Sequence, residues 1–199
     1  MNEVTSPLFE GKHVILRHLL PADAPLYYDW LQNPAFQAYK PYLNRLCPTP
    51  QKLFVHLALQ AQTKPRNELE ILVITQQKQI PLGLIGLAGI DRFNQKAEFL
   101  AGFSRGYGTP AIWEAIHAGI TLSFARFKLH KLICYITPNN HQALNMMQRY
   151  GFSSEGYFQE ELLVNDNKRI DLQRFALMRR AWQDHPLRQR LQRLVPVNL

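Results

Sequence analysis

The chain has 199 residues, of which 46% are hydrophobic, so it can bury a sizeable core, and no internal repeat or low-complexity segment suggests a second one. Its 23 basic and 15 acidic residues leave a formal net charge of +8, and the surface should therefore attract anions. No apolar segment reaches the roughly 20 residues of a membrane span and the first residues lack a signal-peptide profile, which predicts a cytoplasmic protein without a membrane partner.

Hydrophobic periodicity and helix caps predict the elements of the chain. The first part contains a strand, two helices separated by an aromatic loop, and three strands, at residues 13–19, 22–31, 51–62, 69–76, 80–91 and 96–104. A long helix from residue 110, a strand at 131–137, a short helix after Asn140 and two strands at about 155–164 and 169–178 complete the order βααβββαβαββ. This order predicts an α/β fold with a mixed sheet flanked by helices.

Cysteine and histidine usage points away from two kinds of site. Cys47 and Cys134 offer neither a disulfide framework nor a paired metal spacing, so both thiols should be reduced. The seven histidines show no H-E-x-x-H motif or paired ligand spacing. No metal is therefore predicted.

The segment from Ser104 to Pro110 stands where a strand should end and a helix should begin. Thr109 can cap that helix and Pro110 suits its first position, where a missing N–H costs nothing. Gly106 and Gly108 let the backbone turn tightly and gather unpaired N–H groups at the positive end of the helix dipole. Such a loop can hold a phosphate, and a plain tight turn is the alternative.

The motifs around this loop resemble those of the Gcn5-related N-acetyltransferase (GNAT) superfamily, and more narrowly its branch that acetylates the N-termini of ribosomal proteins and related amines. They are Leu16-Arg17, Trp30-Leu31-Gln32-Asn33-Pro34, Arg105-Gly106-Tyr107-Gly108-Thr109, Leu129-His130-Lys131, Asn140, Gly151-Phe152 and Glu155-Gly156. The resemblance covers most of the chain. It implies a mostly antiparallel sheet in which the fourth and fifth main strands splay apart.

The resemblance also implies acetyl-CoA as cosubstrate, bound without a metal. The amides of residues 105–109 should hold its pyrophosphate, pantetheine should run beside the strand that ends near Phe103, and Asn140 should bond the pantetheine amide or simply cap its helix. The predicted coenzyme-binding residues are Phe103, Ser104, Arg105, Gly106, Tyr107, Gly108, Thr109 and Asn140.

Acetyl transfer to an amine also needs a base, an oxyanion donor and a proton for the departing thiolate. Glu98 is the predicted base, because Ala97-Glu98 resembles the dipeptide that opens this strand in the ribosomal branch; a solvated carboxylate is the alternative. A backbone N–H near Gly102 should bind the oxyanion. Where relatives often carry Ser and Tyr as general acids, this chain has Ala143 and Met147, so solvent, substrate assistance or Tyr150 would have to act.

The predicted function is N-acetyl transfer to a primary amine, by direct attack in a ternary complex. The acceptor could be a protein N-terminus, a polyamine or another small amine, and the aromatic residues Trp30, Phe36, Tyr39 and Tyr42 stand either in its pocket or in the core. A catalytically silent acyl-CoA-binding protein and a basic ribosome- or RNA-associated module are the alternatives. The sequence lacks the RNP pattern of an RRM, so no nucleic acid partner is predicted, and it leaves a monomer or a homodimer open.

The last segment is basic and has apolar residues at helical spacing. We expect an acyltransferase domain over residues 1–180 and a helical tail over 181–199, in which Leu187, Leu191 and Leu194 pack on the domain and the arginines are solvated. Attachment of these arginines to RNA, ribosomes or a membrane is the alternative.

Overall fold

The computed structural model describes residues 6–33, 36, 39–40, 42–165 and 168–197, and its central element is one sheet. The described strands are β1 (Phe9–Glu10), β2 (Val14–His18), β3 (Leu69–Thr75), β4 (Pro81–Asp91), β5 (Lys96–Phe103), β6 (Lys131–Ile136), β7 (Ser153–Asn165) and β8 (Lys168–Met178). The described helices are the short 3₁₀ turn η1 (Pro21–Asp23), α1 (Ala24–Leu31), α3 (Leu43–Leu46), α4 (Pro50–Gln62), α5 (Pro110–Ala125), α6 (His141–Arg149), α7 (Arg179–Gln183) and α8 (Pro186–Leu194).

The sheet has the order β1-β2-β3-β4-β5-β6-β8-β7, and every pair of neighbours is antiparallel except β5 and β6. The predicted mixed, mostly antiparallel α/β sheet is therefore confirmed. The structure adds β1 and α3, which have two and four residues and are too short to leave a periodic pattern in the sequence. None of the described helices has the length and apolarity needed to cross a membrane.

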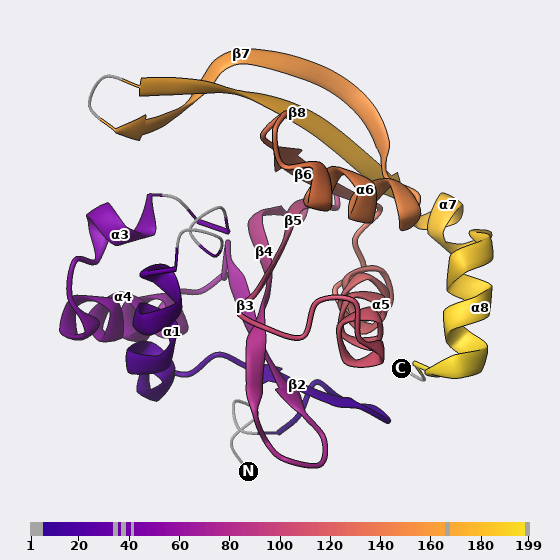
Figure 1. Cartoon of the computed structure of the whole chain (residues 1–199), viewed down its shortest axis with the longest axis horizontal. Helices are drawn as coiled ribbons and strands as arrows, with labels where there is room; N and C mark the ends of the chain where they lie inside the picture. Colours follow the sequence, from indigo (N-terminus) through magenta and orange to yellow (C-terminus); the bar gives the residue numbers. More distant parts are fainter. Residues whose placement is uncertain (1–5, 34–35, 37–38, 41, 166–167, 198–199) are drawn as a thin grey trace.

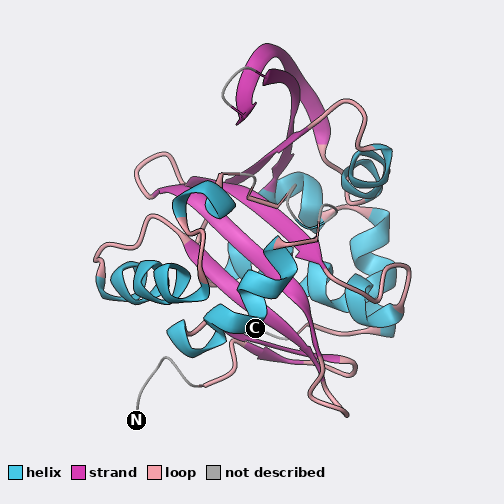
Figure 2. Cartoon of the chain, turned by 60° about the vertical axis from the view of Figure 1, so that its left-hand side comes forward, coloured by secondary structure: helices cyan, strands magenta, loops and turns pink. Residues whose placement is uncertain are grey.

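Helices cover both faces of the sheet (Figure 1; Figure 2). One face carries α1, α3 and α4, and the other carries α5 with the C-terminal helices. Strand β3 is buried on both sides, since Ile71 and Val73 belong to the cluster on the α5 side while Leu72 and Ile74 belong to the cluster around α1 and α4. The alternation of side chains along one strand thus supplies two cores.

Helix α5 is fixed to the start of the chain by a buried carboxylate. Glu114 has no exposed surface, and its two oxygens accept hydrogen bonds from the backbone N–H groups of Lys12 at 2.8 Å, His13 at 2.6 Å and Val14 at 3.0 Å. Three donors satisfy a charge that would otherwise be costly to bury. This contact ties the helix to the turn between β1 and β2.

The C-terminal helices complete the core on the α5 side. Trp182 of α7 is 1% exposed, and Leu191 of α8 is buried with Val195 and Val197 in the cluster that contains the apolar residues of α5. Leu187 packs against this cluster as expected, but Leu194, the last residue of α8, is 55% exposed, so the predicted stripe packs on the domain only in part. The division into a domain at 1–180 and a tail at 181–199 stays a prediction.

The interface between α5 and α7 contains a buried histidine that should make stability depend on pH. Burial, with Arg188 adding to it, lowers the pKa of His117 from 6.5 to about 4. The unfolded chain therefore binds more protons than the folded one between these two pH values, and stability falls as pH falls through this window.

Between pH 7 and pH 4, the pKa difference of His117 should lower the free energy of unfolding by up to about 3 kcal/mol, at about 1.4 kcal/mol per pKa unit. We expect His117→Leu to abolish this part of the acid sensitivity. Urea unfolding of both proteins at pH 7 and pH 4 measures the difference. An equal loss of stability in the variant would show that other groups cause the acid sensitivity.

Candidate active site

A cavity opens where β5 and β6 separate. These parallel strands pair at Lys96–Lys131, Ala97–Leu132 and Glu98–Ile133, and no pairing between them is recorded beyond Glu98. The rest of β5, up to Phe103, keeps its antiparallel partner β4 on one side. Its other edge faces a cavity of about 850 Å³, lined by residues of β5, β6, α6, β7, β8 and the segment around Tyr39. An extended ligand could pair with this open edge.

The glycine loop lies between β5 and α5, as predicted. Gly106 has φ +82° and Gly108 has φ +78°, values that favour glycine, so both residues are needed for this turn. Among the described residues, no atom outside Gly108 and its two chain neighbours lies within 4 Å of the place that a Cβ would take on Gly108, so space remains there for a ligand. Thr109 holds the N-cap position without a capping hydrogen bond from its side chain, and its hydroxyl donates to the carbonyl of Gly106 at 2.6 Å. The helix end stays available to an anion.

The other predicted coenzyme residues differ in what they can offer. Phe103 is 2% exposed, packs in the core and is not among the residues that line the cavity. The Ser104 hydroxyl donates to the carbonyl of Leu82 at 3.1 Å. Arg105 is exposed, and Tyr107 lines the cavity. Asn140 also lines the cavity, while its side-chain oxygen accepts from the N–H of Ala143 at 3.1 Å and caps α6. Coenzyme binding by these residues remains a prediction.

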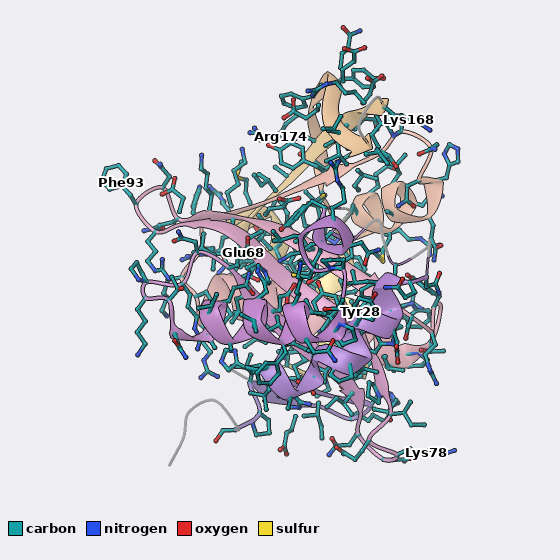
Figure 3. All side chains as sticks on the ribbon, turned by 90° about the vertical axis from the view of Figure 1, so that its left-hand side faces the viewer. Tyr28, Glu68, Lys78, Phe93, Lys168 and Arg174 are labelled. Carbon is teal, nitrogen blue, oxygen red and sulfur yellow. The ribbon has the colours of Figure 1, made fainter. Side chains whose placement is uncertain are left out.

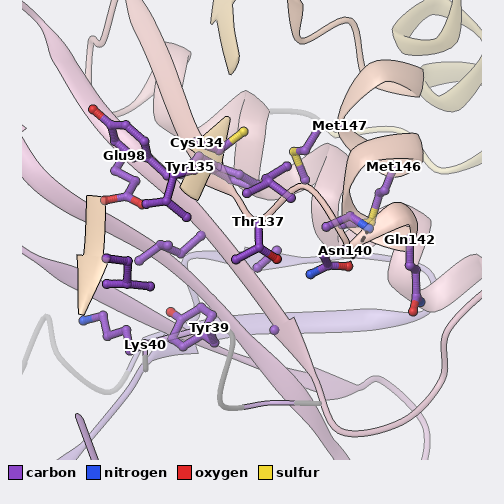
Figure 4. A pocket seen from close by; sticks show the side chains of 18 of the residues that line it. Tyr39, Lys40, Glu98, Cys134, Tyr135, Thr137, Asn140, Gln142, Met146 and Met147 are labelled. Carbon is purple, nitrogen blue, oxygen red and sulfur yellow. Dashed lines mark hydrogen bonds between the residues drawn. The ribbon is translucent and has the colours of Figure 1, made fainter. Parts of the chain in front are cut away.

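Glu98 lies in the cavity at the last position where β5 and β6 pair. Figure 4 shows Glu98, Lys40 and Tyr39 at one end of the cavity, and Asn140 with the side chains of α6 at the other. Burial raises the pKa of Glu98; Lys40 opposes this shift and Glu68 adds to it. A carboxylate with a raised pKa is a stronger proton acceptor, which suits a general base.

Sequence analysis missed the cation at this end of the cavity. Lys40 is 4% exposed, and its Nζ lies 2.8 Å from Glu68 and 3.0 Å from Glu70. Burial alone would lower the pKa of Lys40, but the two carboxylates outweigh it and raise the pKa, so the side chain stays charged. Glu68 lies over the sheet face that carries α4 (Figure 3). The only signal in the sequence was the i, i+2 spacing of the two glutamates, which puts both on one face of a strand.

Comparison with known proteins identifies the family. The profile of the acetyltransferase (GNAT) domain matches residues 13–153. The chain belongs to the GNAT acetyltransferase family. The wider resemblance that the motifs indicated is therefore confirmed.

Several of the proteins that the chain is similar to are spermidine N-acetyltransferases. A curated one, the spermidine N(1)-acetyltransferase of Vibrio cholerae, is 29% identical over 101 residues, which are 49% of this chain and 57% of that protein. The chain thus spans little more than half the length of this curated relative. The solved structure of a spermidine N-acetyltransferase from Vibrio cholerae in complex with CoA and spermine aligns with a TM-score of 0.73 and 21% identity, over 86% of this chain and 98% of that one. A chimera of this SpeG enzyme with hSSAT gives a TM-score of 0.73 and 21% identity, over 86% and 99% of the two chains.

In this GNAT domain no Ser or Tyr of α6 can act as the general acid. Ala143 and Met147 line the cavity at the two positions concerned. The Tyr150 hydroxyl donates to the carbonyl of Trp113 at 3.3 Å, and the ring packs against Trp182 in the core. Tyr150 is not among the residues that line the cavity, so its hydroxyl is not placed to protonate a thiolate there.

Two further observations concern reactive groups in the GNAT domain. Cys47 and Cys134 are free and buried, and burial, to which Glu98 adds, raises the pKa of the Cys134 thiol to about 12. The thiol thus stays protonated at neutral pH. Within the described ranges, no three His, Cys, Asp or Glu side chains are arranged to hold a metal ion.

Proposed function

We propose that the protein is an acetyl-CoA-dependent N-acetyltransferase that acts on a primary amine by direct attack in a ternary complex. The observation that carries this proposal is the separation of β5 and β6 beyond Glu98, which leaves an open strand edge beside a large cavity. Membership of the GNAT family supports the reaction class.

The residues present fit an acetyl-CoA molecule. The glycine loop at the N-terminus of α5 offers backbone N–H groups and open space at Gly108 for the pyrophosphate. The free edge of β5 offers backbone groups to the pantetheine amides. In the gap between β5 and β6, a backbone N–H of β5 near Gly102 would donate to the acetyl carbonyl oxygen. This hydrogen bond would stabilise the oxyanion that forms when the amine attacks.

The opposite end of the cavity favours a cationic acceptor. Among the described residues that line the cavity, the charged ones are Glu98, Glu161 and Lys40, and the ammonium of Lys40 is already paired with the carboxylates of Glu68 and Glu70 behind it. This negative wall belongs to a chain with a net charge of +8, so it is a local feature. The names of the relatives support a polyamine as acceptor. A protein N-terminus, as in the ribosomal branch, is the second candidate.

The amine must lose a proton before it attacks. Glu98 would accept this proton directly or through a water molecule, since its carboxylate lies in the cavity and its pKa is raised. The thiolate would then take its proton from solvent or from the acceptor, because Ala143 and Met147 have none to give. A catalytically silent coenzyme-binding protein remains the alternative on this ground.

An acceptor screen with labelled acetyl-CoA tests the proposal. We expect transfer to spermidine or spermine, and the same assay on peptides with free N-termini decides between the two acceptor classes. Coenzyme binding without transfer to any amine would favour the silent protein. Salt-dependent RNA binding that persists without coenzyme would favour the basic RNA-associated module.

The glycine loop gives a prediction about coenzyme affinity. Gly108→Ala puts a methyl group into the open space of the loop and strains a backbone at φ +78°. We expect the Kd for coenzyme A to rise more than tenfold, or by more than about 1.4 kcal/mol. Gly89→Ala is the matched control, because this residue also has a positive φ of +55° and open space but lies outside the loop. If calorimetry gave the same Kd for both variants and the parent, the glycine loop would not be part of the coenzyme site.

A further inference from the structure

The hydroxyl of Tyr39 is a buried polar group without a partner. Tyr39 is 5% exposed and lines the cavity, and within the described part of the chain no donor or acceptor lies within hydrogen-bonding distance of its oxygen. A buried hydroxyl without a partner costs free energy, so such groups are rare unless a ligand or water completes them. Its place in the wall of the cavity points to a ligand.

Two glycines fix the position of this ring. A Cβ on Gly86 would lie 2.4 Å from the Tyr39 hydroxyl oxygen, and a Cβ on Gly102 would lie 2.9 Å from its ring. Both distances are shorter than real contacts, so the ring fits over β4 and β5 only because neither residue has a side chain. On its other side the ring packs against Phe36, with centroids 5.5 Å apart. Packing therefore holds the hydroxyl in place, without a hydrogen bond to any residue that the structure describes.

The strand register shows what faces the hydroxyl. Gly86 pairs with Glu70 on β3 and with Leu100 on β5, and Glu98 follows on the same face, opposite Ala88. The hydroxyl thus stands over β4, one strand away from the gap, at the end of the cavity that contains Lys40 and Glu98 (Figure 4). The carboxylates of Glu70, Glu68 and Glu98 all act to keep the Tyr39 hydroxyl protonated, which raises its pKa further than burial alone does.

These surroundings decide between the two groups that the hydroxyl could contact. A developing oxyanion would be repelled by the three carboxylates and would form in the gap, about one strand spacing of 4.8 Å away. The N–H groups of a cationic amine are attracted to the same place. The acceptor, rather than the acetyl group, is therefore the partner.

We propose that Tyr39 is a positioning residue that accepts a hydrogen bond from the acceptor amine and holds its nitrogen over the gap, beside Glu98. This inference rests on the proposed N-acetyltransferase function and adds a residue to it. Tyr39 neither takes nor gives a proton in this role, since its hydroxyl remains protonated throughout the working range of pH.

Removal of the hydroxyl alone tests the proposal. We expect Tyr39→Phe to lower kcat/KM for the amine by ten- to a hundredfold, mainly through KM, while Kd for coenzyme A and the shape of the pH profile stay unchanged. Tm should not fall, because the hydroxyl that is removed has no partner among the described residues. Tyr28→Phe is the control, because its hydroxyl donates to the carbonyl of Pro48 at 2.9 Å on the same side of the sheet and does not line the cavity.

A double-mutant cycle with Gly86→Ala separates a positioning role from a structural one. The added methyl should displace the hydroxyl and reproduce the rise in KM, but it should cost little more in the Tyr39→Phe background, where the oxygen it meets is gone. An active parent enzyme with the same KM for the amine in Tyr39→Phe would overturn the inference and leave the proposed function standing. A parent that acetylates no amine would overturn both.

Discussion

Glu98→Gln should lower kcat about a hundredfold at neutral pH, which is the lower range for the loss of one general base. The substitution keeps the shape of the side chain and removes its ability to accept a proton. Because burial raises the pKa of Glu98, the parent should lose activity as pH falls through a value above the ordinary range of a glutamate. The variant should lack this acid limb and should recover part of its activity at high pH, where more of the amine is already neutral.

Steady-state kinetics from pH 5 to pH 10 measure both effects. Glu155→Gln is the matched control, since this carboxylate pairs with Lys131 and Arg174 on the outer part of the sheet and does not line the cavity. Coenzyme affinity should be equal in all three proteins. Full activity of Glu98→Gln at pH 7 would show that the base stands elsewhere or that the amine arrives deprotonated.

Truncation after Ala181 should destabilise the fold strongly. It removes Trp182, which is 1% exposed, together with the buried residues Leu191, Val195 and Val197. The loss of one buried tryptophan costs about 3–5 kcal/mol, so we expect Tm to fall by at least about 6–12 °C in a chain of this size. Below the new Tm, kcat should change little, because none of these residues lines the cavity.

Charge variants of the same helix provide the control. Arg190 and Arg193 are exposed, so Arg190→Gln and Arg193→Gln together should leave Tm unchanged. If the truncated chain melted like the parent while binding to ribosomes or anionic vesicles was lost, the segment would be an attachment site and its packing would be unimportant.

The sequence predicted the elements well, because their signals are local. Helix α5 begins at Pro110 as expected, and the bounds of β5 and β6 differ from the predicted ranges by one residue. The separation of β5 and β6 has no local signal, since it depends on how two strands far apart in the chain meet; the family resemblance alone indicated it.

The candidate site could be predicted only in part. The glycine loop is a contiguous motif and lies where expected, and Glu98 is in the cavity. The ion pairs of Lys40 join a loop to the start of β3. The position of the Tyr39 ring depends on two glycines in different strands. Such arrangements form by tertiary contact, and no periodicity or spacing within one element encodes them.

The bond between Glu114 and the first turn has a consequence for how the protein is made. The residues concerned lie 100 to 102 positions apart in the chain. At a synthesis rate of about 5–20 residues per second, the turn leaves the ribosome roughly 5–20 s before Glu114 does. During that time the backbone N–H groups of the turn between β1 and β2 lack the carboxylate that later accepts their hydrogen bonds. Helix α5, which follows the glycine loop, supplies this carboxylate. The beginning of the fold and the glycine loop should therefore become ordered together, late in translation.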